Sequence, residues 1–455
     1  MGRSERLIIL EFNELSPTLM NQFIDAGFLP NFKVLRDTSN CFVTDAGEEP
    51  PNLEPWIQWV TVHTGQPFSA HKIFHLGDAA SIKLDSIWDW AAQRDWPVWV
   101  CGSMNAVSKQ RGLGWFLPDP WSVGVRPSPA ELDPYFDFVR SQVMEYTRKD
   151  TFSYKAAWRF MRFMVSHGIR ARTIGRIFWQ LVAERFSDVH WRRATILDAL
   201  QFDLFLHGYA NLRPKLSTFF LNSTAHFQHV YWRNMDPASF KVKPSAAEQR
   251  TYQNAVRYGY QNMDRMVGEV LKLAGDNTAI ALVTGLSQQP CVKYEERGGK
   301  RFYKVIDYNR LLSCCDVDPT CCSVEPVMSE QFHLRFASEE QATAAATRLR
   351  ALKFDGVEVL GMRLDGNSIM AGCAVFRALD QDARLDAPFG KQRFADLFYL
   401  VDLTKSGMHH PDGIFWLRST LKEHAKHPGR LPLVEVAPAL AGVLGLSPNN
   451  MSTVC

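Results

Sequence analysis

The feature that constrains the fold most is an apolar run close to the N-terminus. Leu7–Phe12 reads LIILEF, and a continuous run of this kind is typical of a strand buried on both faces of a sheet. Ser16 follows as a helix N-cap with Pro17 in the first turn, which predicts a helix over Thr18–Ala26. The order strand, loop, helix is typical of α/β proteins and places the loop 13–15 at the carboxyl end of the strand.

A second strand end carries imidazoles. In the segment Ser217–Arg233, the apolar run 219–221 gives way to three small polar residues, and His226 and His229 follow. This change is typical of the carboxyl edge of a parallel sheet, where open α/β folds build their sites. We therefore expect a site at this edge, with Arg233 able to hold an anionic group of the substrate.

The charge of the chain is nearly balanced but unevenly distributed. The net charge is +3, so no nucleic acid is expected as a partner. Between Tyr146 and Arg193, however, eleven lysines and arginines stand against three acidic residues. The window Tyr154–Phe186 also places aromatic and aliphatic residues among these arginines. Three alternatives follow: helices on an anionic membrane surface, a lid over the pocket, or an amphipathic insertion whose arginines are solvated.

The N-terminus and the cysteines predict a cytoplasmic protein. MGRSERLIILEF carries only a short apolar run, which fits a first strand and not a signal peptide. No window reaches the ~18 uninterrupted apolar residues of a membrane helix. The nine cysteines are therefore expected to be free thiols, including the adjacent pairs 314–315 and 321–322, because adjacent cysteines chelate zinc poorly. If the basic helices bind a membrane, the location would be peripheral, at its inner face.

Five blocks of sequence follow one another along nearly the whole chain. They are LIILEFNELSPTLMNQFIDAGFLPNFKVLRD from Leu7, Pro50–Gly65 with Pro67 and His71-Lys72-Ile73, Phe219–Arg233, Gly407–Gly413, and Val434–Leu446. In this order they resemble the alkaline phosphatase superfamily, specifically its type I phosphodiesterase/nucleotide pyrophosphatase branch. Proteins of that branch open with a strand ending in Asp-Gly, and later carry Asp-x-x-x-His-x-x-x-Trp and Gly-x-His-x-Pro-x-Gly segments.

The resemblance implies a central, mostly parallel sheet between helices, interrupted by two insertions. The core is expected in three parts, at 1–126, 216–323 and 381–455, with a basic helical insertion at 127–215 and a small α+β insertion at 324–380. Within the small insertion we predict the strand His333–Phe336, the helix Gln341–Leu352, and the strands Val357–Leu360 and Ile369–Phe376.

The reaction of this family needs two metal ions and a Thr, Ser or Cys nucleophile, and most of those residues are replaced. The opening Asp falls on Asn13, and the Asp of Asp-x-x-x-His falls on Ala225. The nucleophile position offers only Leu53–Pro55, and the Ser-Asp-His-Gly segment falls on Thr284–Ser287.

Of the family's usual ligands, only His229 and His409 can be placed in this sequence. Two imidazoles without a carboxylate at the matched positions rarely hold two metal ions. We therefore expect no metal and no other cofactor, and zinc or manganese is disfavoured.

The expected function is an enzyme that acts on a phosphate-containing or nucleotide-activated substrate without a metal, as a transferase or phosphodiesterase in glycan or lipid-linked metabolism. Its partner would be a phosphate-containing small molecule or a glycan. The expected catalytic residues are Glu54, His229 and His409, and the expected substrate contacts are Asn13, Glu14, His226, Arg233, Thr284 and His410. Glu14 is an alternative to Glu54 as the general base. The competing hypotheses are a catalytically inactive binding member and a two-metal phosphodiesterase with a rearranged ligand set.

Overall fold

The computed structural model describes residues 5–109, 114–144, 154–325, 331–377, 379–380, 382–419 and 424–446. Strand β1 (Arg6–Phe12) lies inside an eight-stranded sheet with the order β20-β2-β19-β6-β1-β5-β3-β4. It pairs in parallel with β5 and β6, whereas β19 runs antiparallel to both of its neighbours. The other strands of this sheet are β2 (Asn40–Asp45), β3 (Val98–Cys101), β4 (Gly114–Leu117), β5 (Leu216–Leu221), β6 (Thr278–Val283), β19 (Asp412–Arg418) and β20 (Ala425–Pro432).

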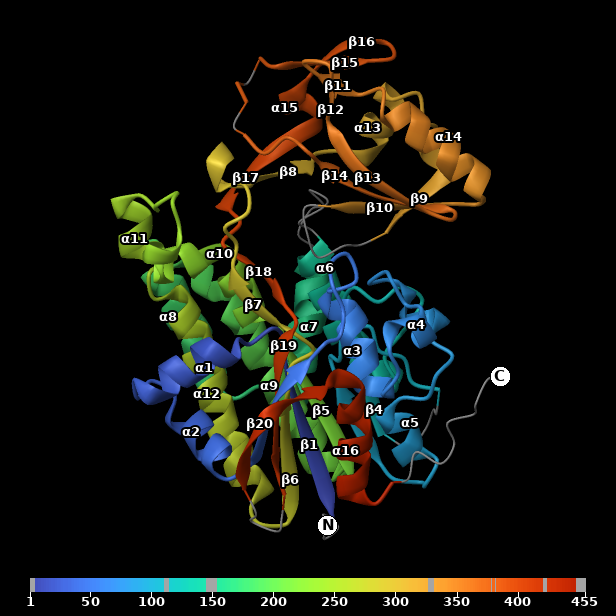
Figure 1. The fold of residues 1–455 in the computed structure, drawn as a ribbon. Helices are drawn as coiled ribbons and strands as arrows, with labels where there is room; N and C mark the ends of the chain where they lie inside the picture. The colour runs from blue at the N-terminus through green and yellow to red at the C-terminus, as the bar shows by residue number, and fades with distance from the viewer. Residues whose placement is uncertain are drawn as a thin grey trace.

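Helices cover both faces of the sheet because the central strands are apolar on both faces (Figure 1). Alternate residues of β1 enter different cores: Ile8 and Leu10 pack in one, and Leu7 and Ile9 in the other. The first core is covered by α1 (Pro17–Asp25), α2 (Pro30–Asp37), α9 (Ala194–Leu212), α10 (Ser223–Met235) and α12 (Ala255–Ala274). The second is covered by α3 (Pro55–Thr64), α5 (Ile87–Ala92) and α16 (Val436–Leu444). The expected α/β class, with a mostly parallel sheet between helices, is confirmed.

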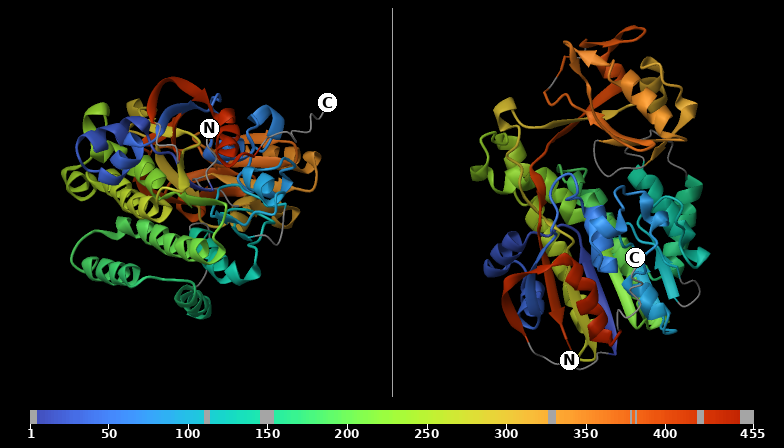
Figure 2. Two further views of the ribbon diagram at one scale, coloured as in Figure 1. Left: turned by 90° about the horizontal axis from the view of Figure 1, so that it is seen from below. Right: turned by 45° about the vertical axis from the view of Figure 1, so that its right-hand side comes forward.

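A helical layer lies outside α9. After α6 (Asp133–Met144), the helices α7 (Tyr154–Ser166) and α8 (Ala171–Ala183) form the layer that stands at the margin of the molecule in the left view of Figure 2. These helices fall within the helical insertion expected from the sequence. Residues 145–153, which carry part of its basic stretch, lie outside the described residues.

A small α+β unit stands above the carboxyl ends of the central strands (Figure 1). Its own core packs side chains from Tyr303 to Leu400, a wider span than the 324–380 expected from the sequence. Two antiparallel strands, β8 (Arg301–Val305) and β17 (Phe398–Thr404), join it to the rest of the chain. Between them lie α13 (Tyr308–Cys314), β9 (Cys322–Glu325), β10 (Phe332–Phe336), α14 (Glu339–Leu349), β11 (Lys353–Phe354), β12 (Val357–Glu358), β13 (Leu360–Asp365), β14 (Ser368–Cys373), β15 (Arg384–Ala387), β16 (Gly390–Arg393) and α15 (Phe394–Leu397).

A short two-stranded ladder lies between the main sheet and this unit. Strand β7 (Ser287–Pro290) follows β6, and β18 (Gly407–His410) precedes β19, and the two pair antiparallel. His409 is therefore held opposite Gln288, close to the carboxyl edge of β6 and β1.

Candidate functional site

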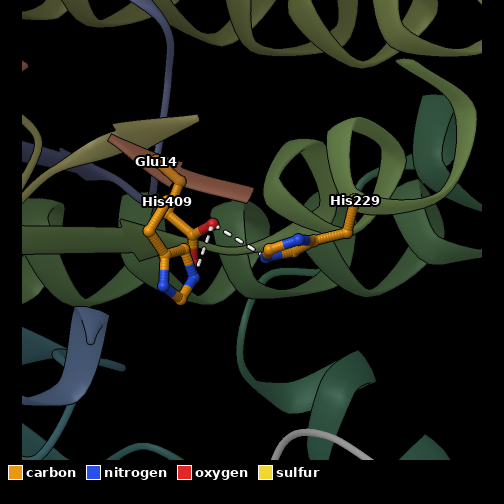
Figure 3. Close-up of side chains that lie close together, drawn as sticks. All are labelled: Glu14, His229 and His409. Carbon is orange, nitrogen blue, oxygen red and sulfur yellow. Dashed lines mark ion pairs between the residues drawn. The ribbon is translucent and has the colours of Figure 1, made fainter. Parts of the chain in front are cut away.

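Three side chains from distant parts of the sequence converge at the carboxyl edge of the sheet (Figure 3). Glu14 follows β1, His229 lies in α10 after β5, and His409 lies in β18. The Nε2 atoms of His229 and His409 lie 3.0 and 3.6 Å from the same oxygen, Oε2 of Glu14. One ligand atom from each residue lies within 4.8 Å of the others. The two histidines singled out in the sequence thus share a carboxylate.

The backbone determines which nitrogen of each imidazole faces this carboxylate. Nδ1 of His229 donates to the carbonyl of Gly407 at 3.0 Å, and Nδ1 of His409 donates to the carbonyl of Leu53 at 2.9 Å. In the neutral tautomers that result, both Nε2 lone pairs point at an anionic oxygen. Such an arrangement requires a positive charge among the three groups, either a proton on an Nε2 or a bound cation.

The carboxylate of Glu14 is buried but ionised. Burial on its own would raise the pKa of Glu14, but the charges of His229 and His409, together with hydrogen bonds from His229 and Gln288, outweigh this effect and lower the pKa to about 2. Burial in turn lowers the pKa of His409 to about 4, although Glu14 acts in the opposite direction. Glu14 is therefore a permanent anion at neutral pH, and His409 presents a neutral imidazole.

The backbone at Glu14 has an unusual conformation. Its φ is 61°, which lies in the left-handed region that residues other than glycine rarely adopt. The side-chain amide of Gln228 donates to the Glu14 carbonyl at 2.7 Å, and the hydroxyl of Tyr260 donates to Gln228 and accepts from the backbone N–H of Ser16. These bonds from α10 and α12 hold the loop in a conformation that aims the carboxylate at both histidines.

Asn13, expected as a substrate contact, serves as a buried connector. Its amide nitrogen donates to Oε1 of Glu14 and to Oδ1 of Asn222, both at 2.8 Å, and its amide oxygen accepts from the indole N–H of Trp59 at 2.7 Å. The amide thus orients Glu14, while all its own hydrogen-bonding groups are satisfied by the protein.

Glu54, expected to be catalytic, stands beside the cluster. It is the N-cap residue of α3, and its Oε2 lies 3.5 Å from Nδ1 of His409. Its side chain is 31% exposed, whereas that of Glu14 is 2% exposed. Glu54 is therefore the carboxylate of this group that can meet a molecule from solution.

The structure places the remaining expected contacts outside the cluster. His226 is exposed, one turn before His229 on α10. Arg233 is buried, and the charges that act on its guanidinium include Glu248 and Glu295. The hydroxyl of Thr284 accepts from the backbone N–H of Ile414 and ties β6 to β19. Nδ1 of His410 accepts from the backbone N–H of Asp412. Because neighbouring residues in a strand point to opposite faces, the His410 side chain points away from that of His409.

Sequence reasoning missed the amides that support the cluster. The amide nitrogen of Gln288 donates to Oε2 of Glu14 and to the carbonyl of Ala225. Gly407 is equally important, because a Cβ there would lie 2.2 Å from the Gln288 side chain and 2.6 Å from the carbonyl of Gln228. The available signal was the pair of glutamines at 288 and 289, directly after the segment Thr284–Ser287 where the resemblance expects Asp and His.

The residues fit one metal ion and not two. Among the described residues, Glu14, His229 and His409 are the sole grouping of three donors close enough to share an ion. Two imidazole nitrogens and a carboxylate are a ligand set found for zinc and other divalent transition metals, and both imidazoles have the outer hydrogen bond that ligating histidines usually make. In the described part of the chain, the cysteines 314, 315, 321 and 322 form no such grouping.

Comparison with known proteins gives only remote likenesses. No family model matches the sequence, and no curated protein matches it. Among solved structures, the chain is similar to the phosphonoacetate hydrolase from Sinorhizobium meliloti 1021 in complex with phosphonoacetate, at 12% identity and a TM-score of 0.45, over 97% of this chain and 96% of that chain. It is also similar to murine ectonucleotide pyrophosphatase/phosphodiesterase 5, at 11% identity and a TM-score of 0.43, over 97% and 95% of the two chains. Scores this low carry no argument about function.

Proposed function

We propose that this chain is a divergent enzyme of the alkaline phosphatase superfamily that acts on a phosphate-containing small molecule at the centre formed by Glu14, His229 and His409. The observation that carries the proposal is the convergence of these three side chains on one oxygen atom at the carboxyl edge of the sheet. The five sequence blocks support it, since His229 and His409 come from two of them.

We further propose that the centre holds one divalent metal ion, with Glu14 and Nε2 of each histidine as ligands. The expectation of no metal rested on the missing carboxylates at Asn13 and Ala225, and the neighbouring Glu14 supplies one. When bound at such a centre, a divalent ion polarises a phosphoryl oxygen and stabilises the oxygen that leaves.

The other residues have roles that follow from their positions. Glu54 is the general base, because its carboxylate reaches solvent beside His409 and can take the proton of an attacking water or alcohol. Asn13 and Gln288 are positioning residues, because both donate to Glu14. The positive charge of Lys405 acts on His409, and would favour the approach of a phosphate group.

Water as the acceptor would make the enzyme a phosphodiesterase, and a sugar or lipid alcohol would make it a transferase. Both belong to the proposal, as do a nucleotide-activated or glycan substrate and a cytoplasmic location. A product assay with and without an added alcohol acceptor distinguishes the two reactions.

Metal titration tests the centre directly. Protein freed of metal by a chelator is titrated with Zn²⁺ or Mn²⁺ in a calorimeter, and one equivalent per chain is expected to bind. Glu14→Gln should weaken this binding by roughly 10–100-fold or more, on the scale found for disturbed metal sites. His410→Gln is the matched control and should bind like the wild type, since His410 points away from the centre.

Turnover then separates the alternatives. A panel of phosphodiesters and sugar nucleotides is assayed with the titrated protein and with Glu54→Gln, which should lower kcat by about 10²–10⁴-fold. If turnover survives chelation, the metal is not needed for the reaction, and metal-free acid–base catalysis replaces the metal centre as the mechanism. The proposal fails if no phosphate compound is turned over and none raises the melting temperature of the protein. The chain would then be a non-catalytic member.

A further inference from the structure

Helix α8 turns most of its apolar side chains away from the protein. Ile177 packs against the core, but its inward neighbours are polar: Arg176 donates to Oδ1 of Asn262 at 2.7 Å, and Gln180 donates to the carbonyl of Val189 at 2.8 Å. Ile174, Phe178, Trp179 and Leu181 face outward, each at least half exposed. An ordinary surface helix has the opposite arrangement, with its apolar stripe against the core.

Helix α7 adds a second exposed apolar stripe. Tyr154, Trp158, Met161 and Val165 are spaced by four, three and four residues, which places them on one face of the helix. All four are exposed, and Trp158 is 72% exposed. The opposite face of α7 is buried through Phe160, Phe163 and Met164, so this helix needs nothing further to pack on the protein.

The charged side chains of the two helices are all cations, and Glu184, which follows α8, is paired with Arg193. Lys155, Arg159 and Arg162 on α7 are exposed, as is Arg185 just after α8, and neither helix contains an acidic residue. The left view of Figure 2 shows the two helices as an outer layer with no part of the drawn chain beyond them. We call the exposed residues of α7 and α8, together with Arg185 and Phe186, the outer face.

We propose that the outer face docks on an anionic lipid bilayer, with its aromatic and aliphatic side chains in the interface and its cations against the headgroups. Exposed Trp, Phe and Leu beside Lys and Arg are the composition of helices that lie in a membrane surface, and each cation near an anionic leaflet adds about 1 kcal/mol. A second copy of this chain is a poorer occupant, because a symmetric contact would bring the same cations against each other. None of the helices in the described part of the chain is long and apolar enough to span a membrane. This inference does not depend on the proposed function.

Flotation with lipid vesicles tests the inference. The protein should float with vesicles of phosphatidylcholine and phosphatidylglycerol in equal parts, and remain in solution with phosphatidylcholine alone. Raising the salt from about 0.1 M to about 1 M shortens the screening length from about 10 Å to about 3 Å, and should release most of the bound protein. Arg159→Gln with Arg162→Gln should weaken binding roughly thirty-fold, since two cations contribute about 2 kcal/mol and 1.4 kcal/mol is a factor of ten.

A second double variant tests the apolar part. Phe178→Ser with Trp179→Ser should abolish flotation and leave the far-UV circular dichroism unchanged, because both side chains point to solvent. The matched controls lie in the small α+β unit: Arg350→Gln with Arg384→Gln, and Val357→Ser with Phe389→Ser, all exposed. Controls should float like the wild type. The inference is wrong if anionic vesicles do not bind the protein, if outer-face and control variants bind alike, or if sedimentation shows that the outer face joins two copies instead.

Discussion

At Asn13 an amide performs a task that a carboxylate cannot. Its nitrogen faces two acceptor oxygens, on Glu14 and Asn222, and its oxygen faces the indole donor of Trp59. An aspartate would keep the bond from Trp59 but would turn an anionic oxygen toward Glu14. The resemblance expects Asp-Gly where this chain has Asn13-Glu14, and here the carboxylate stands on Glu14 and the amide of Asn13 orients it.

Asn13→Asp is therefore expected to destabilise the metal-free protein. Two hydrogen bonds become repulsive contacts between buried acceptors, which costs about 1–3 kcal/mol at neutral pH. Urea unfolding of both proteins in the presence of a chelator measures the difference, and equal stabilities would contradict the connecting role of Asn13.

Asp198 has a pKa that makes stability depend on pH. Burial raises its pKa to about 7, although hydrogen bonds from Ser223 and Asn262 and the charge of Arg176 act to lower it. The folded protein keeps this proton over a range in which the unfolded chain has lost it, so the contribution to stability is full below about pH 4 and is lost as the pH rises to about 7.

Asp198→Asn removes this titration. The free energy of unfolding of the wild type should fall relative to that of the variant between pH 4 and about 7. Urea unfolding at several pH values checks this, and parallel pH curves for the two proteins would refute it.

At the scale of elements, the sequence signals were strongest where they were local. The strand predicted at Leu7–Phe12 and the helix predicted at Thr18–Ala26 agree with β1 (Arg6–Phe12) and α1 (Pro17–Asp25) to within one residue at each end, because an apolar run and a Ser-Pro helix start mark them locally. The strand predicted at Val357–Leu360 is instead divided between β12 and β13. The β7–β18 ladder could not be predicted, because it pairs residues more than a hundred positions apart whose sequences are not strand-like.

The difference between local signals and contacts of distant residues also explains what could be predicted of the site. His229 and His409 were identified because the resemblance assigns them positions, and Glu54 because it replaces a nucleophile. The central place of Glu14 depends on a left-handed backbone and on Gln228, Gln288 and Tyr260, contacts that no local pattern encodes.

Gly407 tests the packing of β18 against α10. Gly407→Ala should cost at least about 1–3 kcal/mol, because its Cβ would overlap the backbone carbonyl of Gln228 and the side chain of Gln288. It should also weaken metal binding, since the Gly407 carbonyl orients His229. Gly442→Ala in α16 is the control: its Cβ meets nothing within 4 Å, and alanine favours the helix. Similar unfolding curves for the two variants would overturn the close approach at Gly407.

At the scale of the whole molecule, a pair of stacked histidines joins the small α+β unit to the core. The ring centroids of His75, in the core, and His333, in the small α+β unit, lie 4.0 Å apart. Nδ1 of His333 lies 2.9 Å from Glu325, and Arg335 bridges Glu325 and Asp78. The contact between the two bodies is therefore built from titratable groups.

The contribution of His75 to the stability of the folded protein should fall in acid. Burial, reinforced by His333, lowers the pKa of His75 to about 4, so the unfolded chain takes up a proton near pH 6.5 that the folded protein refuses. This contribution is present above about pH 6.5 and is lost as the pH falls toward 4.

His75→Gln should reduce the loss of melting temperature between pH 7.5 and pH 5, and the exposed His424→Gln should leave it unchanged. Differential scanning calorimetry at the two pH values measures both. If His75→Gln retains the full loss of the wild type, the stacked pair is not its source.

The left-handed backbone at Glu14 has a consequence for any attempt to improve this protein. Glycine would adopt φ 61° without the cost of about 1 kcal/mol that a side chain incurs there. It would, however, leave the amides of Asn13 and Gln288 and the two imidazoles without their shared acceptor, which costs more than the strain that is relieved. A directed-evolution library scored on heat resistance alone should therefore retain Glu14, so that selection for stability preserves the centre as well.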